Sequence, residues 1–312
     1  MHGKSANGAA GAQPSKQLGL NIQDVADAAG VSKTTVSHVL TGNRPVSPAT
    51  RRKVEQVMEE LGYKPNFFAQ ALNTQRSQTI ALIAQDLTNP FYPALARGVQ
   101  IAVADSPHVV MLFDAGASGG AVGNFIEAAI QRRVDGIVVA VSPFQDELAV
   151  LRQAGIPVVA VGPGYDDLAV DSVTADDARI GYDATRTLLA KGHTHVGVVT
   201  GPVSSATAID RLRGFERAMN EVGLEVPSSY VVEGDWTRDS GYSAVRHMLS
   251  LQQPPTAVFC GNDLMAIGAM DAAVEHGISL PDDLAIIGVD DIDAASLLRP
   301  ALTTVQIPAQ EI

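Results

Sequence analysis

Carboxylate, amide and aromatic side chains recur after short apolar runs of this 312-residue chain, and an Arg lies on the helical segment that follows one of these runs. The set comprises Asp86, Asn89, Phe91, Arg211, Trp236, Asn262, Asp290 and Gln306. Phe and Trp rings stack on the C–H face of a sugar ring, while vicinal hydroxyls share Arg donors and Asp acceptors. These residue types therefore suit a site for a small polyhydroxylated ligand.

Several of these residues also have a purely structural explanation. Asp290 could cap the next segment, and Asn262-Asp263 could cap a helix that begins near Leu264. Trp236 could belong to the core, and Arg211 could form a surface ion pair with Asp210 or Glu216. Their common position after apolar runs favours binding over these alternatives.

An enzymatic function is not supported by the other reactive residues. Ser204-Ser205 with His193 and His195 would suit a hydrolase, but neither serine lies in a Gly-x-Ser-x-Gly motif, and no Gly-x-x-x-x-Gly-Lys-Ser/Thr motif occurs in the chain. The seven His show no metal-ligand spacing, and Cys260 lies in an apolar run that predicts a small core residue. We expect no catalytic residue, no metal and no cofactor.

The apolar runs predict the elements that position these side chains. Seven β-branched runs lie at Ile80–Ala84, Val109–Phe113, Ile137–Val141, Val158–Val161, Val196–Thr200, Ala257–Cys260 and Ala285–Val289. Helical segments are expected between them at 93–104, 122–133, 146–154, 177–191, 208–222, 239–250 and 264–276. This alternation predicts an α/β fold of doubly wound parallel sheets, divided into two lobes, in which ligands bind at the carboxyl ends of strands.

The segment Leu20–Leu40 has a different pattern, typical of a helix-turn-helix. Ile22, Val25, Ala26 and Ala29 form one apolar helical face before Gly30. Ser32 can cap a second helix with an apolar side formed by Val36, Val39 and Leu40. Its outer face then carries Lys33, Thr34, Ser37 and His38, which are hydrogen-bonding residues suited to a DNA major groove.

A third helix and a short hinge follow. Ser47-Pro48 predicts the start of the third helix and Gly62 its end. Asn66 can cap a helix of less than two turns, which is marginal alone and would need a partner helix or DNA.

Charge is distributed unevenly along the chain. Residues 1–76 contain nine Lys or Arg and five Asp or Glu, a net charge of +4. Because the whole chain carries −12, the remainder carries −16. A basic head on an acidic body is typical of a protein that binds phosphates through the head.

The composition fits a soluble intracellular protein with no membrane partner. One Cys cannot form an internal disulfide, and no apolar run reaches about 18 residues. Residues 1–19 lack the apolar centre of a signal peptide and are expected to form a disordered tail.

The segments VSKTTVSHVLTG and VSPATRRKVEQVMEELGYKPNFFAQAL resemble the head of the lactose-repressor (LacI/GalR) family of bacterial transcription regulators. The resemblance continues through NPFY, GHTHVGVVTGP, FCGNDLMAIGA, IGVDD and LTTV. It implies a helix-turn-helix domain at 20–64, a hinge helix and linker at 65–76, and a two-lobed effector-binding and dimerisation domain at 77–312. That domain would have the periplasmic-binding-protein architecture, with crossovers near Gly162, Asp290 and Val305.

The resemblance also implies roles for particular residues. The DNA-binding positions would be Lys33, Thr34, Thr35, Ser37, His38, Asn43, Arg51, Tyr63, Asn66, Ala69 and Leu72. The leucine matching Leu72 wedges into the minor groove of the operator. Asp176 would add a carboxylate to the effector pocket, beside Arg211, Trp236, Asn262, Asp290 and Gln306.

The sequence departs from the family pattern at three places. His38 stands where an Arg is usual, Gln70 replaces a frequent hinge Arg, and the chain stops at Ile312, before an expected helix and strand. We therefore expect an atypical operator and a shortened first lobe.

The predicted function is a ligand-responsive repressor that binds a pseudo-palindromic operator as a homodimer, with a sugar as effector. A nucleobase or nucleoside effector and a solute-binding protein without a DNA role are the alternatives.

Overall fold

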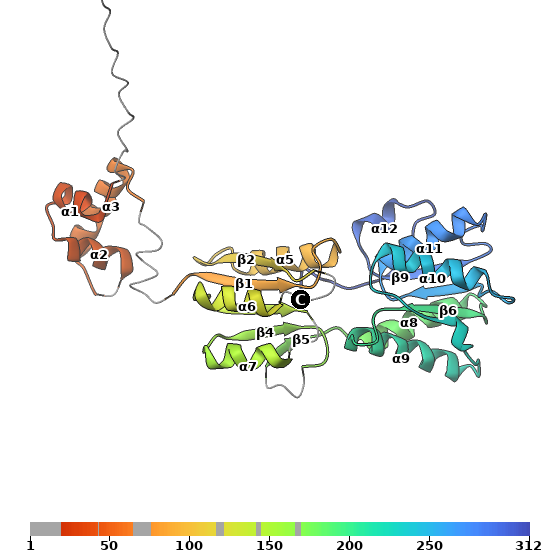
Figure 1. Cartoon of the computed structure of the whole chain (residues 1–312). Helices are drawn as coiled ribbons and strands as arrows, with labels where there is room; N and C mark the ends of the chain where they lie inside the picture. The colour runs from red at the N-terminus through yellow and green to blue at the C-terminus, as the bar shows by residue number, and fades with distance from the viewer. Residues whose placement is uncertain (1–19, 43, 65–75, 117–121, 142–144, 166–169) are drawn as a thin grey trace, which may run out of the picture. The chain divides into compact units, whose positions relative to one another are not determined.

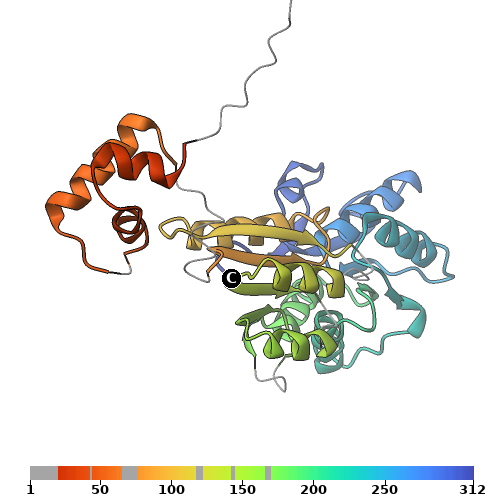
Figure 2. The same cartoon turned by 60° about the vertical axis from the view of Figure 1, so that its left-hand side comes forward.

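The computed structural model describes residues 20–42, 44–64, 76–116, 122–141, 145–165 and 170–312. The chain divides between Arg76 and Ser77 into two compact units, called here the head and the body. Figures 1 and 2 show both units from two directions. The tail 1–19 lies outside the described residues, as does the hinge segment 65–75.

The head contains three helices whose ends follow from local sequence. They are α1 (Ile22–Ala29), α2 (Lys33–Thr41) and α3 (Pro48–Leu61). Ser32 and Ser47 cap α2 and α3 by accepting hydrogen bonds from the amides of Thr35 and Thr50. Gly30 and Gly62 adopt the left-handed conformation that ends α1 and α3. The predicted caps and ends are thus confirmed.

The three helices of the head enclose a small core. Val25, Ala26 and Ala29 of α1 pack against Val36 and Val39 of α2, and Val54 of α3 completes the cluster. This core orients α2 so that its polar side faces solvent.

The body contains two five-stranded sheets in which all paired strands are parallel. The first has the order β2-β1-β3-β4-β5, from β1 (Thr79–Ala84), β2 (Val109–Asp114), β3 (Gly136–Ala140), β4 (Val158–Val161) and β5 (Asp171–Val173). The second has the order β10-β9-β8-β6-β7, from β6 (Val196–Thr200), β7 (Val231–Glu233), β8 (Ala257–Cys260), β9 (Ala285–Asp290) and β10 (Thr303–Gln306). The predicted doubly wound α/β fold is confirmed.

Helices cover both faces of the first sheet because successive side chains of a strand point to opposite faces. Ala81 and Ile83 of β1 pack against α6 (Val122–Gln131) and α7 (Gln145–Gln153), while Leu82 packs against α5 (Phe91–Ala102). Figure 1 shows α5 and α6 on opposite sides of β1.

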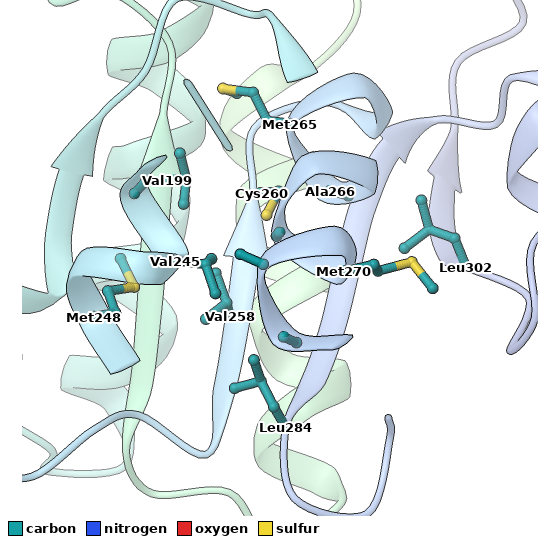
Figure 3. Close-up of a cluster of buried hydrophobic side chains, with 14 of the residues drawn as sticks. Val199, Val245, Met248, Val258, Cys260, Met265, Ala266, Met270, Leu284 and Leu302 are labelled. Atoms are coloured by element: carbon teal, nitrogen blue, oxygen red, sulfur yellow. The ribbon is translucent and has the colours of Figure 1, made fainter. Parts of the chain in front are cut away.

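The second sheet is covered in the same way. Its helices are α8 (Asp177–Ala190), α9 (Ala206–Glu221), α10 (Arg238–Leu249), α11 (Asp263–Glu275) and α12 (Asp293–Leu297), with a 3-10 turn at Ser228–Tyr230. Val258 and Cys260 of β8 pack against α10 and α11, as Figure 3 shows, whereas Phe259 packs against α8 and α9. Cys260 is fully buried, as expected.

Two of the expected crossovers between lobes are wrong. The chain does not leave the first sheet near Gly162, because β5 pairs with β4 before α8 begins. It also does not cross near Asp290, because β9 and β10 are neighbours in the second sheet. The chain crosses after Gln306, and Gln310 lies against Gly98 of α5 in the first lobe.

No helix in the described ranges is both long enough and apolar enough to cross a membrane.

Candidate functional site

A cavity of about 400 Å³ lies in the body, where the carboxyl ends of strands from both sheets meet. This volume is in the usual range for a small-molecule site. The loops after β1, β3 and β4 line it from the first lobe, and those after β6, β7 and β8 from the second. Seven of the predicted effector residues line it: Asp86, Asn89, Phe91, Arg211, Trp236, Asn262 and Asp290.

Arg211 is the cation of this cleft, and it is held by three neighbours. Its Nε donates to Asp177 Oδ1 at 2.8 Å, and one terminal nitrogen donates to the carbonyl of Gly261. Its guanidinium lies 5.8 Å from the centre of the Trp236 ring. The two side chains of the ion pair are only 8% and 4% exposed, so the surface pairing considered above is wrong.

Trp236 is positioned by its backbone and by two neighbours. Its φ of 70° is unusual for a residue other than glycine. Asn262 Nδ2 donates to the Trp236 carbonyl at 2.9 Å, and Asn262 Oδ1 caps α11 by accepting from the Met265 amide. A Cβ at Gly201 would collide with the indole, so glycine is required there. Asn262 therefore has the structural role considered above and also lines the cleft.

Asp290 is the least satisfied carboxylate of the cleft. Within the described part of the chain its side chain makes no hydrogen bond, and it caps no helix. Burial raises the pKa of Asp290 to about 7. The nearby Arg211 lowers this pKa, but the Asp263 and Asp177 carboxylates raise it and so oppose Arg211. Burial also raises the pKa of Asp263, to about 6, although Thr304 and the Ile292 amide donate to it. A ligand hydroxyl or ammonium could supply the donor that Asp290 lacks.

Aromatic rings and a turn form the wall from the first lobe. Asn89 Oδ1 accepts from the Phe91 amide at 3.0 Å, and the Phe91 and Tyr92 rings meet edge to face at 5.2 Å. Burial, followed by the Asp290 and Asp86 carboxylates, raises the pKa of Tyr92. The phenol therefore stays protonated and can donate.

Two predicted effector residues do not line the cavity. Asp176 is exposed and caps α8 by accepting from the Arg179 amide at 2.9 Å, so its neighbour Asp177 is the lining carboxylate. Gln306 is exposed within β10 and donates to Asp291 at 3.1 Å.

The structure adds lining residues that were not predicted. They include Tyr165, Asp177, Ser204, Ser205 and Asp235. Tyr165, Ser204 and Ser205 lie within five residues of the ends of β4 and β6, so a wider window after these predicted strands would have found them. Asp177 follows the short strand β5, and Asp235 follows the short strand β7.

The hydrolase alternative fails on geometry. Ser204 follows the carboxyl end of β6, whereas His193 and His195 precede its amino end. His193 pairs instead with the Thr256 hydroxyl at 3.0 Å. No group of three or more potential metal ligands occurs in the described part of the chain.

The second helix of the head presents the predicted polar face. Lys33 and Thr34 are exposed in its first turn, while Ser37 and His38 are half-buried one turn later. The Thr35 hydroxyl is bonded to Ser32 at 2.9 Å and supports the cap. Helix α2 thus offers one short polar surface to a groove.

The remaining predicted DNA-binding residues differ in position. Arg51 donates to the Val39 carbonyl at 3.3 Å and lies 3.6 Å from Glu55, so it also ties α3 to α2. Tyr63 is half-buried against the head core. Asn43, Asn66, Ala69 and Leu72 lie outside the described residues, as does Gln70.

The head and the body each match a model of a known protein family. Residues 21–66 match the family model "Bacterial regulatory proteins, lacI family". Residues 77–312 match the model "Periplasmic binding proteins and sugar binding domain of LacI family".

Full-length relatives show the same arrangement. The chain is 36% identical to the ribose operon repressor of Escherichia coli K12, over 93% of this chain and 89% of that protein. A Lac repressor dimer bound to operator and an anti-inducer matches with a TM-score of 0.83 at 29% identity, covering 94% and 88% of the two chains. A CelR–cellobiose complex matches with a TM-score of 0.68 at 30% identity, covering 93% and 89%.

A DNA-binding head followed by a two-lobed small-molecule-binding body defines a class of allosteric transcription regulator. The chain belongs to the LacI family. It is a ligand-responsive repressor of the kind that acts on operator DNA as a dimer, and its relatives are regulators rather than enzymes.

Proposed function

We propose that the effector is a sugar or sugar derivative, that it binds in the cleft between the lobes, and that it sets the affinity of the head for the operator. The observation that carries this proposal is the arrangement around Arg211. A fixed guanidinium, an indole ring and unsatisfied carboxylate oxygen converge on one cavity. Vicinal hydroxyls of a sugar can accept hydrogen bonds from the guanidinium and donate to the carboxylate oxygen, while the C–H groups of the sugar ring stack on the indole.

The printed names of two relatives support a sugar. One is a ribose operon repressor, and another was crystallised with cellobiose. A nucleobase or nucleoside is the second candidate, because Phe91, Tyr92 and Trp236 offer three aromatic rings to a flat base. Neither candidate requires a metal or cofactor. We place the protein in the bacterial cytoplasm, where operator DNA is found.

The test is a thermal-shift screen of sugars, nucleosides and nucleobases against the full chain, followed by operator-binding measurements with each ligand that stabilises it. A sugar that stabilises the protein and changes operator affinity supports the proposal. If nucleosides or nucleobases do so and no sugar does, the second candidate replaces it.

Two matched variants test whether the ligand binds in the cleft. Asp290→Asn should lower the affinity for the ligand at least about tenfold, since a charge-assisted hydrogen bond contributes roughly 1.5–3 kcal/mol. Operator binding without ligand should not change. Asp176→Asn retains the α8 cap and should leave ligand affinity unaltered. Equal affinities of both variants and the unmodified protein would remove Asp290 from the site.

A further inference from the structure

The charges that line the cleft are strongly unequal. Four carboxylates face it, those of Asp86, Asp177, Asp235 and Asp290, whereas Arg211 is the single cationic residue among the described lining residues. The parts of the body outside the described residues, 117–121, 142–144 and 166–169, contain no Lys, Arg or His. An anion entering the cleft would therefore meet mostly like charge.

Arg211 is poorly placed to compensate for this excess. Asp177 accepts from its Nε and already neutralises it, and the Gly261 carbonyl accepts from one terminal nitrogen. An anionic group would have to compete with a buried carboxylate that is fixed beside the guanidinium. The ion pair leaves the carboxylates of Asp86 and Asp235 uncompensated, and Asp290 adds a third charge once it is deprotonated.

Helix N-termini are the other common anion sites, and four of the described helices have their N-cap or first residue among the residues that line the cleft. Each has an early amide bonded to a side-chain oxygen of the protein itself. The accepting residues are Asn89 for α5, Asp176 for α8, Ser205 for α9 and Asn262 for α11. The caps reduce the number of amides that a phosphate or carboxylate could use.

We propose that the cleft selects its ligand by charge, admitting uncharged or cationic molecules and rejecting phosphorylated or carboxylated ones. The effector is then a free sugar, an amino sugar or an uncharged nucleoside, and sugar phosphates, sugar acids and nucleotides are excluded. The identification of the cleft as the effector site rests on the proposed function; the charge selection is a property of the cleft itself.

Trp236 allows a direct test because it is the single Trp of the chain and lines the cavity. Its fluorescence in the full-length protein is quenched with iodide, caesium and acrylamide at constant ionic strength. Each quenching constant is divided by that of free N-acetyltryptophanamide. We expect the normalised constant for caesium to exceed that for iodide at least about threefold, because a negative potential concentrates cations and repels anions. A normalised iodide constant equal to or above that of caesium would overturn the proposal.

Charge variants test whether the lining carboxylates cause the difference between the caesium and iodide constants. Asp86→Asn combined with Asp235→Asn removes two lining charges and keeps amide oxygens that can accept the same hydrogen bonds from Thr88 and Thr237. This double variant should raise the iodide constant and lower the caesium constant. Asp105→Asn with Glu127→Gln removes two exposed charges that do not line the cavity and should leave both constants unchanged. Equal shifts in the two double variants would assign the effect to the net charge of the body instead.

Matched ligands extend the test to recognition. Ribose is compared with ribose 5-phosphate, and glucose with glucosamine and glucose 6-phosphate, by their effect on Trp236 emission. A phosphate ester that binds more tightly than its parent sugar would contradict charge selection. If quenching shows the expected asymmetry but no ligand alters operator affinity, the proposed function fails while charge selection stands.

Discussion

Arg211 lines the cleft and also supports the fold. It lies on α9 and reaches Asp177 at the start of α8 and the carbonyl of Gly261 after β8. Removing one partner of a buried ion pair leaves the other charge uncompensated, at a cost of about 3–5 kcal/mol. Arg211→Ala therefore cannot separate a binding role from a structural one.

We predict that Arg211→Ala lowers the unfolding free energy of the body by about 3–5 kcal/mol in urea titration. Arg211→Met with Asp177→Leu should recover most of the loss, since the pair is replaced by apolar groups of similar volume. An unchanged unfolding midpoint in Arg211→Ala would show that the pair contributes little.

Asp290 and Asp263 make stability depend on pH. Their pKa values are raised to about 7 and about 6, whereas an unfolded Asp titrates near about 3.9. Between these values the folded protein holds protons that the unfolded chain has released. Their contribution to stability is therefore fully present at low pH and is lost as the pH rises through about 7.

We predict that Asp290→Asn raises the melting temperature of the ligand-free protein at pH 8 more than at pH 5. A carboxamide of the same shape has no charge to desolvate at high pH. Asp176→Asn, at an exposed cap, serves as the control in the same thermal scans. A constant difference between Asp290→Asn and the unmodified protein across this pH range would contradict the assignment.

Among the helices of the head, we expect α2 to determine which operator is read. Thr34 and His38 lie on its solvent side, whereas Arg51 bonds the Val39 carbonyl from α3. We predict that Thr34→Ala with His38→Ala changes the consensus obtained by binding-site selection. Arg52→Ala on α3 should instead weaken all operators similarly, if it contacts phosphates. An unchanged consensus in the double variant would sink the assignment of base contacts.

Paired glycines set the distance between neighbouring helices of the second lobe. A Cβ at Gly268 of α11 would collide with the Arg238 carbonyl, and one at Gly241 of α10 with the Met265 carbonyl. At Gly123 of α6, no described atom lies within 4 Å of such a Cβ.

We predict that Gly268→Ala destabilises the body by about 1–3 kcal/mol, through overpacking against backbone. Gly123→Ala should be neutral or stabilising by at most about 1 kcal/mol, because alanine favours a helix. Chemical denaturation of the two variants makes the comparison, and equal effects would refute the role of close packing.

The sequence predicted elements better than exact contacts. Buried strands such as β6 and β8 are continuous apolar runs, so their position was evident before the structure. Strand β5 was missed because it has three residues and all are exposed. Asp176 was placed in the pocket although Asp177 lines it, since neighbouring residues at a helix start point in different directions and composition cannot resolve them.

The head and the body each have their own core, and the segment 65–75 joins them along the chain. That segment, with Leu72, lies outside the described residues. The minor-groove wedge therefore stays a prediction: Leu72→Ala should weaken specific operator binding more than non-specific binding and should reduce the bend seen in circular-permutation gel shifts. An unaltered bend and specificity ratio would contradict it.

On the proposed function, occupancy of the cleft changes the affinity of the head for its operator. The most direct measurement titrates one ligand from the screen into the full chain and follows Trp236 emission and operator affinity together. Because allosteric coupling typically amounts to about 1–3 kcal/mol, we predict an operator Kd that changes roughly 5- to 150-fold. Trp236 emission and operator affinity should reach their midpoints at the same ligand concentration, after correction for the effect of bound DNA on ligand affinity. A ligand that saturates the Trp236 signal while the operator Kd stays constant would show that the cleft and the DNA-binding head are not coupled.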